Sequence, residues 1–404
     1  MAGFFPIFFK DYWSHGTAPN LSTFHLGTAN SIACVAIAAV APLLGAIADK
    51  AGARKKFLLF FVFLGVVMTG SLFFVSQGNW RPAAVIYIFA IIGFYGGNIF
   101  YDSLLVNVSP EKKFDSVSAL GYALGYLGGG LLFALNVVMV LSPRTFGFTH
   151  HDEAIRSSFL LVALWWAVFS IPIFIFVKEQ KAPHQPGVLN HVFSGFRQFC
   201  LTFREIRKLK VVFLFLLGYW LYIDGVDTII LMAIDYGMSI GLSSKSLILA
   251  LLITQFVGFP AALAFGKLGE KFGAKFGILI GIGVYMGVTT WSYFIQRELE
   301  FYILAIIVGL VQGGVQSLSR SFYAKIVPKN KAAEFFGFYN MLGKFAAVMG
   351  PIFIGWISLL TGNPRYSILS LLLLFIPGAI ILLCVDEKTG KQKASELETA
   401  NDAQ

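Results

Sequence analysis

Charged residues are scarce in this chain. Lysine, arginine, aspartate and glutamate together make up 13% of its 404 residues, whereas 57% are hydrophobic. Soluble domains carry about 25% charged residues, so this composition excludes an ordinary soluble protein and indicates a polytopic membrane protein. Each charge inside an apolar segment therefore needs an explanation.

Cysteine and histidine are also rare. Cys34, Cys200 and Cys384 lie far apart in the sequence and match no metal or redox spacing, so we expect no disulfide. The six histidines fall in connecting segments. We interpret "HHDE" at 150–153 as a solvated loop, because no second group of metal ligands lies nearby. The sequence predicts no cofactor.

Signatures of catalysis are missing too. The chain contains no paired acids, His-Glu zinc spacing, nucleophile elbow or nucleotide-binding loop. We therefore expect that the protein is not an enzyme.

Long apolar stretches make up most of the chain. A helix that crosses the hydrocarbon layer needs about 20 apolar residues. The sequence predicts eleven spans, at residues 26–48, 57–76, 83–108, 116–141, 157–177, 211–236, 246–268, 275–295, 301–326, 335–360 and 366–385. Ahead of them, "MAGFFPIFF" is long enough for about half a span and too short for a signal peptide. We expect a twelfth span, first in order, whose front half is missing from this sequence.

Lysine and arginine are distributed unevenly between the connecting segments. If the segment after the 26–48 span is cytoplasmic, 22 of the 31 basic residues fall on the cytoplasmic side and seven on the other. The remaining two, Arg320 and Lys344, lie inside spans. Cytoplasmic loops carry such an excess, so we expect both ends of the chain in the cytoplasm. The net charge of +10 then follows from topology and requires no nucleic-acid partner.

The longest polar stretch divides the chain. We expect a six-helix bundle at 1–177 with an incomplete first helix, a cytoplasmic linker at 178–210, a second six-helix bundle at 211–385 and a cytoplasmic tail at 386–404. Within the linker, apolar residues at helical spacing among arginines are typical of an amphipathic helix on the inner leaflet. These residues are Val192, Phe196, Phe199 and Phe203.

A polar motif occurs twice. "GAIADKAGARKK" from Gly45 and "GKLGEKFGAK" from Gly266 each follow the second span of their half, at a constant offset of 221. The glycines allow a tight turn, the acid can meet a helix N-terminus, and the bases can meet acids on a neighbouring span. The charged residues are Asp49, Lys50 and Arg54 in the first copy, and Glu270, Lys271 and Lys275 in the second. A six-plus-six chain with this loop in both halves resembles the major facilitator superfamily, which implies an all-α fold of two bundles with pseudo-two-fold symmetry.

A second repeat involves the charge in "GVQSLSRSFYAKIVP". Aligning Pro110 with Pro328 matches Asp102 with Arg320 at an offset of 218. A charge at membrane depth is costly and usually marks a pathway, a partner or a gate.

Two interpretations of Arg320 remain. In the first, Arg320 pairs with Glu270, and Asp102 pairs with Arg54 or Lys50, as an inner latch that breaks when the halves rock. In the second, Arg320 binds substrate from a central cavity. We favour the latch, because Arg320 lies only about 9 Å from the cytoplasmic end of its span.

Three stretches carry a narrower resemblance: "FLLGYWLYIDGVDTI", "ALGYALGYLGGG" and "SLSRSFYAKIVPKNKAAEFFGFYNMLGKFAAVMGP". They resemble the autophagy-related vacuolar amino-acid effluxer family and its bacterial relatives of unknown substrate. The resemblance covers nearly the whole chain. It implies twelve spans, alternating access and, from the eukaryotic members, amino-acid export. The aromatic-acidic stretch that begins the family's first helix is absent here.

The 211–236 span contains two acids. Helical spacing places Trp220, Asp224, Asp227 and Thr228 on one face. Intramembrane acids are usually functional, and burial disfavours their charged form, so Asp224 is a candidate proton carrier. The alternative is a structural pair that bonds to nearby tyrosines.

Other polar residues inside spans are also candidates for a substrate site. Gln312, Gln316 and Arg320 form a stripe in one span, and Asn98 lies on the matching face of another. This stripe is explained equally well by interhelical hydrogen bonds and by a cavity wall. Lys344 is a stronger candidate, because no acid lies within a turn of it in its own helix.

We therefore expect a monomeric secondary transporter in a bacterial inner membrane that moves a small organic solute. An amino acid suits the charges, and proton coupling is an open alternative. One rival is a proton-coupled exporter of drugs or other metabolites, which a growth-inhibition screen would separate. The other is a non-transporting membrane sensor, for which the 19-residue tail is too short an output domain.

Overall fold

The computed structural model describes residues 5–179, 209–362 and 364–402, and these residues form helices and no strands. The all-α membrane fold is therefore confirmed. The first half contains α1 (Phe5–Phe8), η1 (Phe9–Trp13), α2 (Pro19–Ala51), α3 (Arg54–Ser71), η2 (Leu72–Phe74), α4 (Trp80–Ser103), α5 (Leu105–Val108), η3 (Glu111–Lys113), α6 (Phe114–Leu141), η4 (Pro143–Phe146) and α7 (His151–Phe176). The second half contains α9 (Lys210–Ser239), α10 (Ser244–Phe272), α11 (Ala274–Ser292), α12 (Glu298–Ile326), η5 (Lys329–Lys331), α13 (Ala332–Thr361), α14 (Pro364–Leu369), α15 (Leu372–Leu383) and α16 (Glu387–Asp402).

The predicted spans correspond to helices. Ten stretches of the described residues are long and apolar enough to cross a membrane, and each overlaps one predicted span. The remaining predicted span, 335–360, corresponds to α13, whose 30 residues extend about 45 Å. The predicted 366–385 span is divided, because α14 ends at Leu369 and α15 begins at Leu372. Ahead of α2, residues 5–13 form the expected short helical segment.

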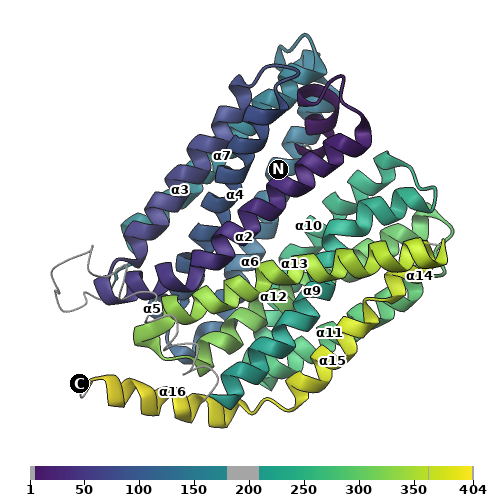
Figure 1. Ribbon diagram of the computed structural model, residues 1–404. Coiled ribbons are helices and arrows are strands. Elements are labelled where there is room, and N and C mark those ends of the chain that lie inside the picture. Colours follow the sequence, from purple (N-terminus) through teal and green to yellow (C-terminus); the bar gives the residue numbers. More distant parts are fainter. Residues whose placement is uncertain (1–4, 180–208, 363, 403–404) are drawn as a thin grey trace.

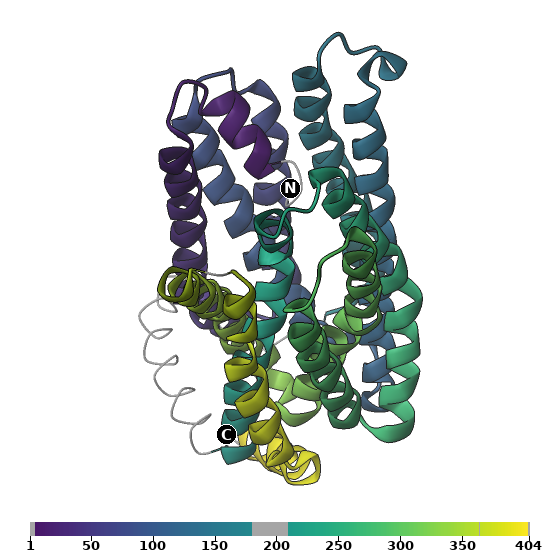
Figure 2. The same ribbon diagram turned by 90° about the vertical axis from the view of Figure 1, so that its right-hand side faces the viewer.

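The two halves form two helix bundles (Figures 1 and 2). They meet along two helix pairs, since α2 packs on α13 and α6 packs on α10. Glycines permit the close approach: a Cβ added at Gly45 would overlap the carbonyl oxygen of Ala333, and one at Gly337 would overlap the backbone of Pro42.

The repeated loops turn on glycine, as predicted. Gly52 ends α2 with a φ of 55°, and Gly273 ends α10 with a φ of 89°. Residues other than glycine rarely adopt such positive φ values. Each loop therefore reverses the chain sharply and presents its charged residues at the end of its bundle.

The C-terminal tail is an ordered helix at the same end of the molecule as α5 and the start of α13 (Figure 1). Gly390 of α16 lies against Ile326 and Val211, so α16 packs on the ends of α12 and α9. The predicted amphipathic helix at 192–203 lies outside the described residues.

Candidate functional site

A cavity of about 470 Å³ lies between the two halves. Its wall is formed by α4 and α6 of the first half and by α9, α10, α12 and α13 of the second. Four charged residues line it: Asp102, Asp227, Arg320 and Lys344. Such a concave site between bundles, near the middle of long helices, is where transporters of this architecture bind solutes.

Arg320 connects the two halves at this cavity. Its Nη1 donates to Oδ1 of Asp102 at 3.1 Å, and only 5% of its side chain is exposed. Its Nε and Nη2 donate to the hydroxyl and carbonyl oxygens of Ser118, both at 2.9 Å. The guanidinium also lies over the rings of Tyr101 and Tyr122. Arg320 is therefore almost fully engaged by the first half.

This arrangement corrects the predicted pairings. Arg320 pairs with Asp102 and not with Glu270, which is exposed at the end of α10. Asp102 pairs with neither Arg54 nor Lys50, because Arg54 binds Asp49 of its own loop at 2.6 Å. The physical reason is symmetry: residues at equivalent positions on helices that face each other across the pseudo-two-fold axis meet one another.

Asp49 holds the start of α13. Its carboxylate accepts hydrogen bonds from the backbone N–H groups of Ala333 at 3.2 Å and Glu334 at 2.8 Å. A negative charge at a helix N-terminus is favourable, as the motif predicted. Arg54 adds a bond to the carbonyl oxygen of Lys329 at 3.0 Å. The first loop therefore clamps the second half.

Three other charged residues of the repeated loops do not take part in this clamp. Lys50, Glu270 and Lys271 are exposed, and the described contact of Lys271 is with the ring of Phe272. The clamp is thus asymmetric between the two copies of the motif.

Asp115 makes a contact between the two halves that the sequence analysis did not predict. This buried acid in the first turn of α6 accepts hydrogen bonds from Ser321 and Lys325 of α12, both at 2.6 Å. Its position at the start of a span, two residues after Lys113, is the signal that could have indicated it.

Asp227 and Lys344 face the same cavity from α9 and α13. The ammonium of Lys344 lies 3.5 Å from the ring centroid of Tyr95. Within the described part of the chain, neither Asp227 nor Lys344 forms an ion pair at 4.0 Å or less. Both predicted residues therefore offer their charge to the cavity.

The other predicted residues of α9 turn away from the cavity. Asp224 is 1% exposed, and its Oδ1 accepts a hydrogen bond from the backbone N–H of Gly350 at 2.9 Å and from Thr228 at 3.3 Å. Trp220 packs against the core of the second half. Of the four residues that helical spacing places on one face, only Asp227 lines the cavity.

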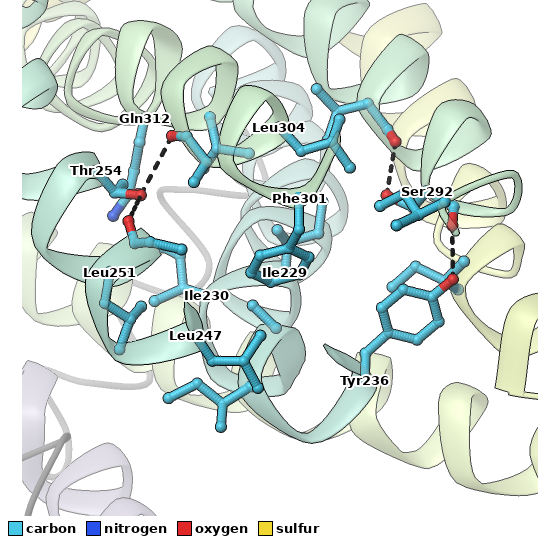
Figure 3. A pocket seen from close by; sticks show the side chains of 18 residues that line it. Ile229, Ile230, Tyr236, Leu247, Leu251, Thr254, Ser292, Phe301, Leu304 and Gln312 are labelled. Carbon is cyan, nitrogen blue, oxygen red and sulfur yellow. Dashed lines mark hydrogen bonds between the residues drawn. The ribbon is translucent and has the colours of Figure 1, made fainter. Parts of the chain in front are cut away.

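The predicted polar stripe is also divided. Asn98 and Gln316 line the central cavity together with Arg320. Gln312 instead lines a second pocket of about 90 Å³ among α9, α10, α11 and α12. Figure 3 shows this pocket, whose lining is mainly aliphatic, with Tyr236 hydrogen-bonded to the carbonyl oxygen of Ser292 at its edge.

Tyrosines form a large part of the cavity wall and were not predicted. They are Tyr101, Tyr122, Tyr126, Tyr219 and Tyr339. The four-residue repeat of Gly-Tyr in "ALGYALGYLGGG" indicates such a face. Gly121 and Gly125 line the cavity, and a Cβ at Gly129 would contact Gln255 of α10, so the glycines at this four-residue spacing face the other half.

Comparisons with known proteins agree with this architecture. The family model described as "Vacuole effluxer Atg22 like" matches residues 19–111 and 106–395. YxiO of Bacillus subtilis, described as an uncharacterized MFS-type transporter, is 41% identical over 391 residues, which cover 95% of this chain and 90% of YxiO. Autophagy-related protein 22 of Yarrowia lipolytica is 26% identical over 315 residues, which cover 71% of this chain and 53% of that protein.

Solved structures show the same fold. The proton:xylose symporter XylE superimposes with a TM-score of 0.74 at 12% identity, covering 97% of this chain and 93% of XylE. FucP in its outward conformation gives a TM-score of 0.70 at 12% identity, covering 92% of this chain and 91% of FucP. The relatives of this chain are transporters and not enzymes, as predicted. The chain therefore belongs to the Atg22-like family of the major facilitator superfamily.

Proposed function

We propose that this protein is a secondary transporter of a small zwitterionic solute of the amino-acid type. The observation that carries the proposal is the pair of opposite charges, Asp227 and Lys344, which line one cavity without forming an ion pair to each other. An ammonium group would bind at Asp227 and a carboxylate at Lys344. The family model describes a vacuole effluxer, and the resemblance drawn from the sequence implies amino-acid export for the eukaryotic members, which supports the same class of cargo.

The structure favours Lys344 over Arg320 as the carboxylate ligand. Arg320 donates hydrogen bonds to Asp102 and Ser118, so binding a solute would cost it these contacts. The described contact of Lys344 is with the ring of Tyr95, which leaves its N–H donors for a ligand. The same argument favours Asp227 over Asp224, which faces away from the cavity.

The transport step follows from the contacts between the halves. The contacts of Asp49, Asp102 and Asp115 close the end of the molecule that carries the repeated loops. We assign this end to the cytoplasm because of its excess of lysine and arginine, with both chain ends on that side. The structure then corresponds to an outward-facing state, and transport requires these contacts to break. We also propose a monomer in a bacterial inner membrane, with the proton as driving ion.

Purified protein in liposomes tests the proposal. We expect exchange of labelled L-amino acids from a panel of twenty, and we expect Lys344→Met and Asp227→Asn to lower the apparent affinity at least tenfold. The Lys344→Met variant should lose affinity only for solutes that carry a carboxylate. An amino-acid amide, which lacks this group, should therefore compete with the labelled amino acid equally well in the variant and in the wild type. Thr254→Val, a matched change in the pocket of Figure 3, should leave exchange intact.

Exchange of no amino acid by the wild type would refute the cargo class. A drug or metabolite exporter on the same fold would instead protect cells in a growth-inhibition screen across toxic compounds.

A further inference from the structure

Asp224 is a carboxyl group that the binding site does not use. It is 1% exposed, its Oδ1 accepts both of its hydrogen bonds, and its Oδ2 has no partner among the described atoms. A buried ionised carboxylate is costly unless cations or several donors surround it. A proton on Oδ2 removes this cost, so the geometry provides a place for one.

The charged surroundings of Asp224 are simple. On its own helix, Asp227 is the residue whose charge acts on it. From α13, Lys344 acts on Asp227. The described contacts of α12 and α15 with this part of α9 include those of Ser319, Phe375 and Gly378, which carry no charge. Asp227 is therefore the charged residue that acts on Asp224 from the described surroundings.

The two acids lie three residues apart on α9, so their Cβ atoms are about 5–6 Å apart. Like charges at this distance repel, and such a pair titrates as a unit in which one proton is shared. Asp227 lines the cavity and Asp224 does not. A cation that binds at Asp227 from the cavity would remove the repulsion and allow Asp224 to ionise.

We propose that Asp224 holds the coupling proton and that the ammonium group of the solute, when it binds at Asp227, expels this proton. The proposal rests on the proposed function and adds the residue and the direction of coupling. The proton leaves Asp224 for the aqueous side from which the solute binds, and another proton returns from the opposite side after the solute leaves. One solute and one proton are exchanged, which makes the protein an antiporter.

Helix α13 is hydrogen-bonded to the carboxyl group that carries this proton. Pro351 follows Gly350 inside α13. Helices often bend at proline, because proline has no N–H to donate within the helix. The N–H of Gly350 is bonded to Asp224 on the neighbouring helix. A carboxylate accepts a hydrogen bond more strongly than a neutral acid does. Loss of the proton therefore tightens α9 against the helix that carries Lys344.

Proteoliposomes test the coupling without knowledge of the natural solute, by using the amino acid from the panel that the wild type exchanges fastest. An acidic lumen should drive at least a fivefold accumulation of this amino acid in wild-type vesicles. Asp224→Asn should keep exchange within about twofold and lose the accumulation, because an amide cannot carry the proton. Asp224→Glu should retain part of the accumulation.

Thr254→Val is the control, since Thr254 bonds the carbonyl oxygens of Ala250 and Ala305 and makes no described contact with Asp224. It should keep both exchange and accumulation. A direct readout is proton release from the purified wild type on addition of the amino acid, followed with a pH indicator and absent in Asp224→Asn.

The remaining outcomes separate a failure of this proposal from a failure of the proposed function. Wild-type exchange without accumulation, or with accumulation only when the exterior is acidic, overturns this proposal and leaves the proposed function standing. Full accumulation by Asp224→Asn overturns it as well. Loss of both exchange and accumulation in Asp224→Asn at normal expression assigns a structural role to Asp224 instead. Absence of any exchange by the wild type refutes the proposed function itself.

Discussion

The guanidinium of Arg320 lies 3.1 Å from the carboxylate of Asp102, and these two residues occupy equivalent positions in the two halves of the repeat. The first half supplies the acid and the second half the base. A symmetric pair of acids or of bases would repel at this place, whereas the opposite charges of the two halves make this contact across the axis attractive.

The first prediction concerns this ion pair. Arg320→Gln and Asp102→Asn should each reduce transport strongly, because removal of one partner from a buried pair costs about 3–5 kcal/mol. The double swap, Arg320→Asp with Asp102→Arg, should recover part of the activity lost by the single changes. Transport at equal expression measures both effects.

Glu270 provides the control for that prediction. It is exposed and belongs to the second copy of the loop, so Glu270→Gln should retain most of the activity. Rescue of Arg320→Glu by Glu270→Arg would contradict the ion pair that the structure shows.

The second prediction concerns the clamp on α13. Asp49→Asn should weaken the bonds to Ala333 and Glu334 and destabilise the closed end by about 1.5–3 kcal/mol, since hydrogen bonds to charged groups contribute that much. Spin labels at Lys112 and Asn330, which are exposed on opposite halves, should then show a larger population of long distances.

The neighbouring Lys50→Gln is a matched control, because Lys50 is exposed on the same loop. Its distance distribution should equal that of the parent protein. An unchanged distribution in Asp49→Asn would show that Asp49 does not hold the end closed.

The third prediction concerns helix packing. Gly45→Ala should force α2 and α13 apart, because the added Cβ would overlap the carbonyl oxygen of Ala333, and such overpacking costs about 1–3 kcal/mol. Gly27→Ala on the same helix meets nothing within 4 Å and should be neutral or slightly stabilising. Thermal unfolding in detergent compares the two, and equal melting temperatures would argue against the close approach.

The fourth prediction concerns α16. Lys391 of this helix lies 3.1 Å from Glu111 of the first half and 3.0 Å from Glu387. Partial burial alone lowers the pKa of Lys391, but hydrogen bonds and charges from Glu387 and Glu111 outweigh it and raise the pKa. The ammonium therefore stays charged at neutral pH, and the pair loses its contribution only as the pH rises through this elevated pKa.

Because both side chains of the pair are more than a third exposed, its contribution to closure should be small, about 0–1 kcal/mol, and should decrease with salt. A double-mutant cycle of Lys391→Gln and Glu111→Gln on the spin-label distances measures it at low and high salt. A coupling energy that does not change with salt would indicate that the helix acts through packing alone.

Much of this protein is determined by the sequence itself. Long apolar stretches fix the spans, since a backbone in hydrocarbon must satisfy its own hydrogen bonds within a helix. The glycines of the repeated loop, such as Gly52 and Gly273, fix the turns because they adopt positive φ values. The repeat and the family resemblance follow from the same local patterns, as does the choice of Asp227 and Lys344 as candidates.

The tertiary structure alone decides which charges meet. Helical spacing placed Asp224 and Asp227 on one face, but a 60° difference in direction is enough to turn one toward Gly350 and the other into the cavity. Arg320 meets Asp102 across the axis instead of Glu270 in its own half. Arg320 and Asp102 are 218 residues apart in the sequence, and their contact depends on how the bundles pack, which no local pattern records.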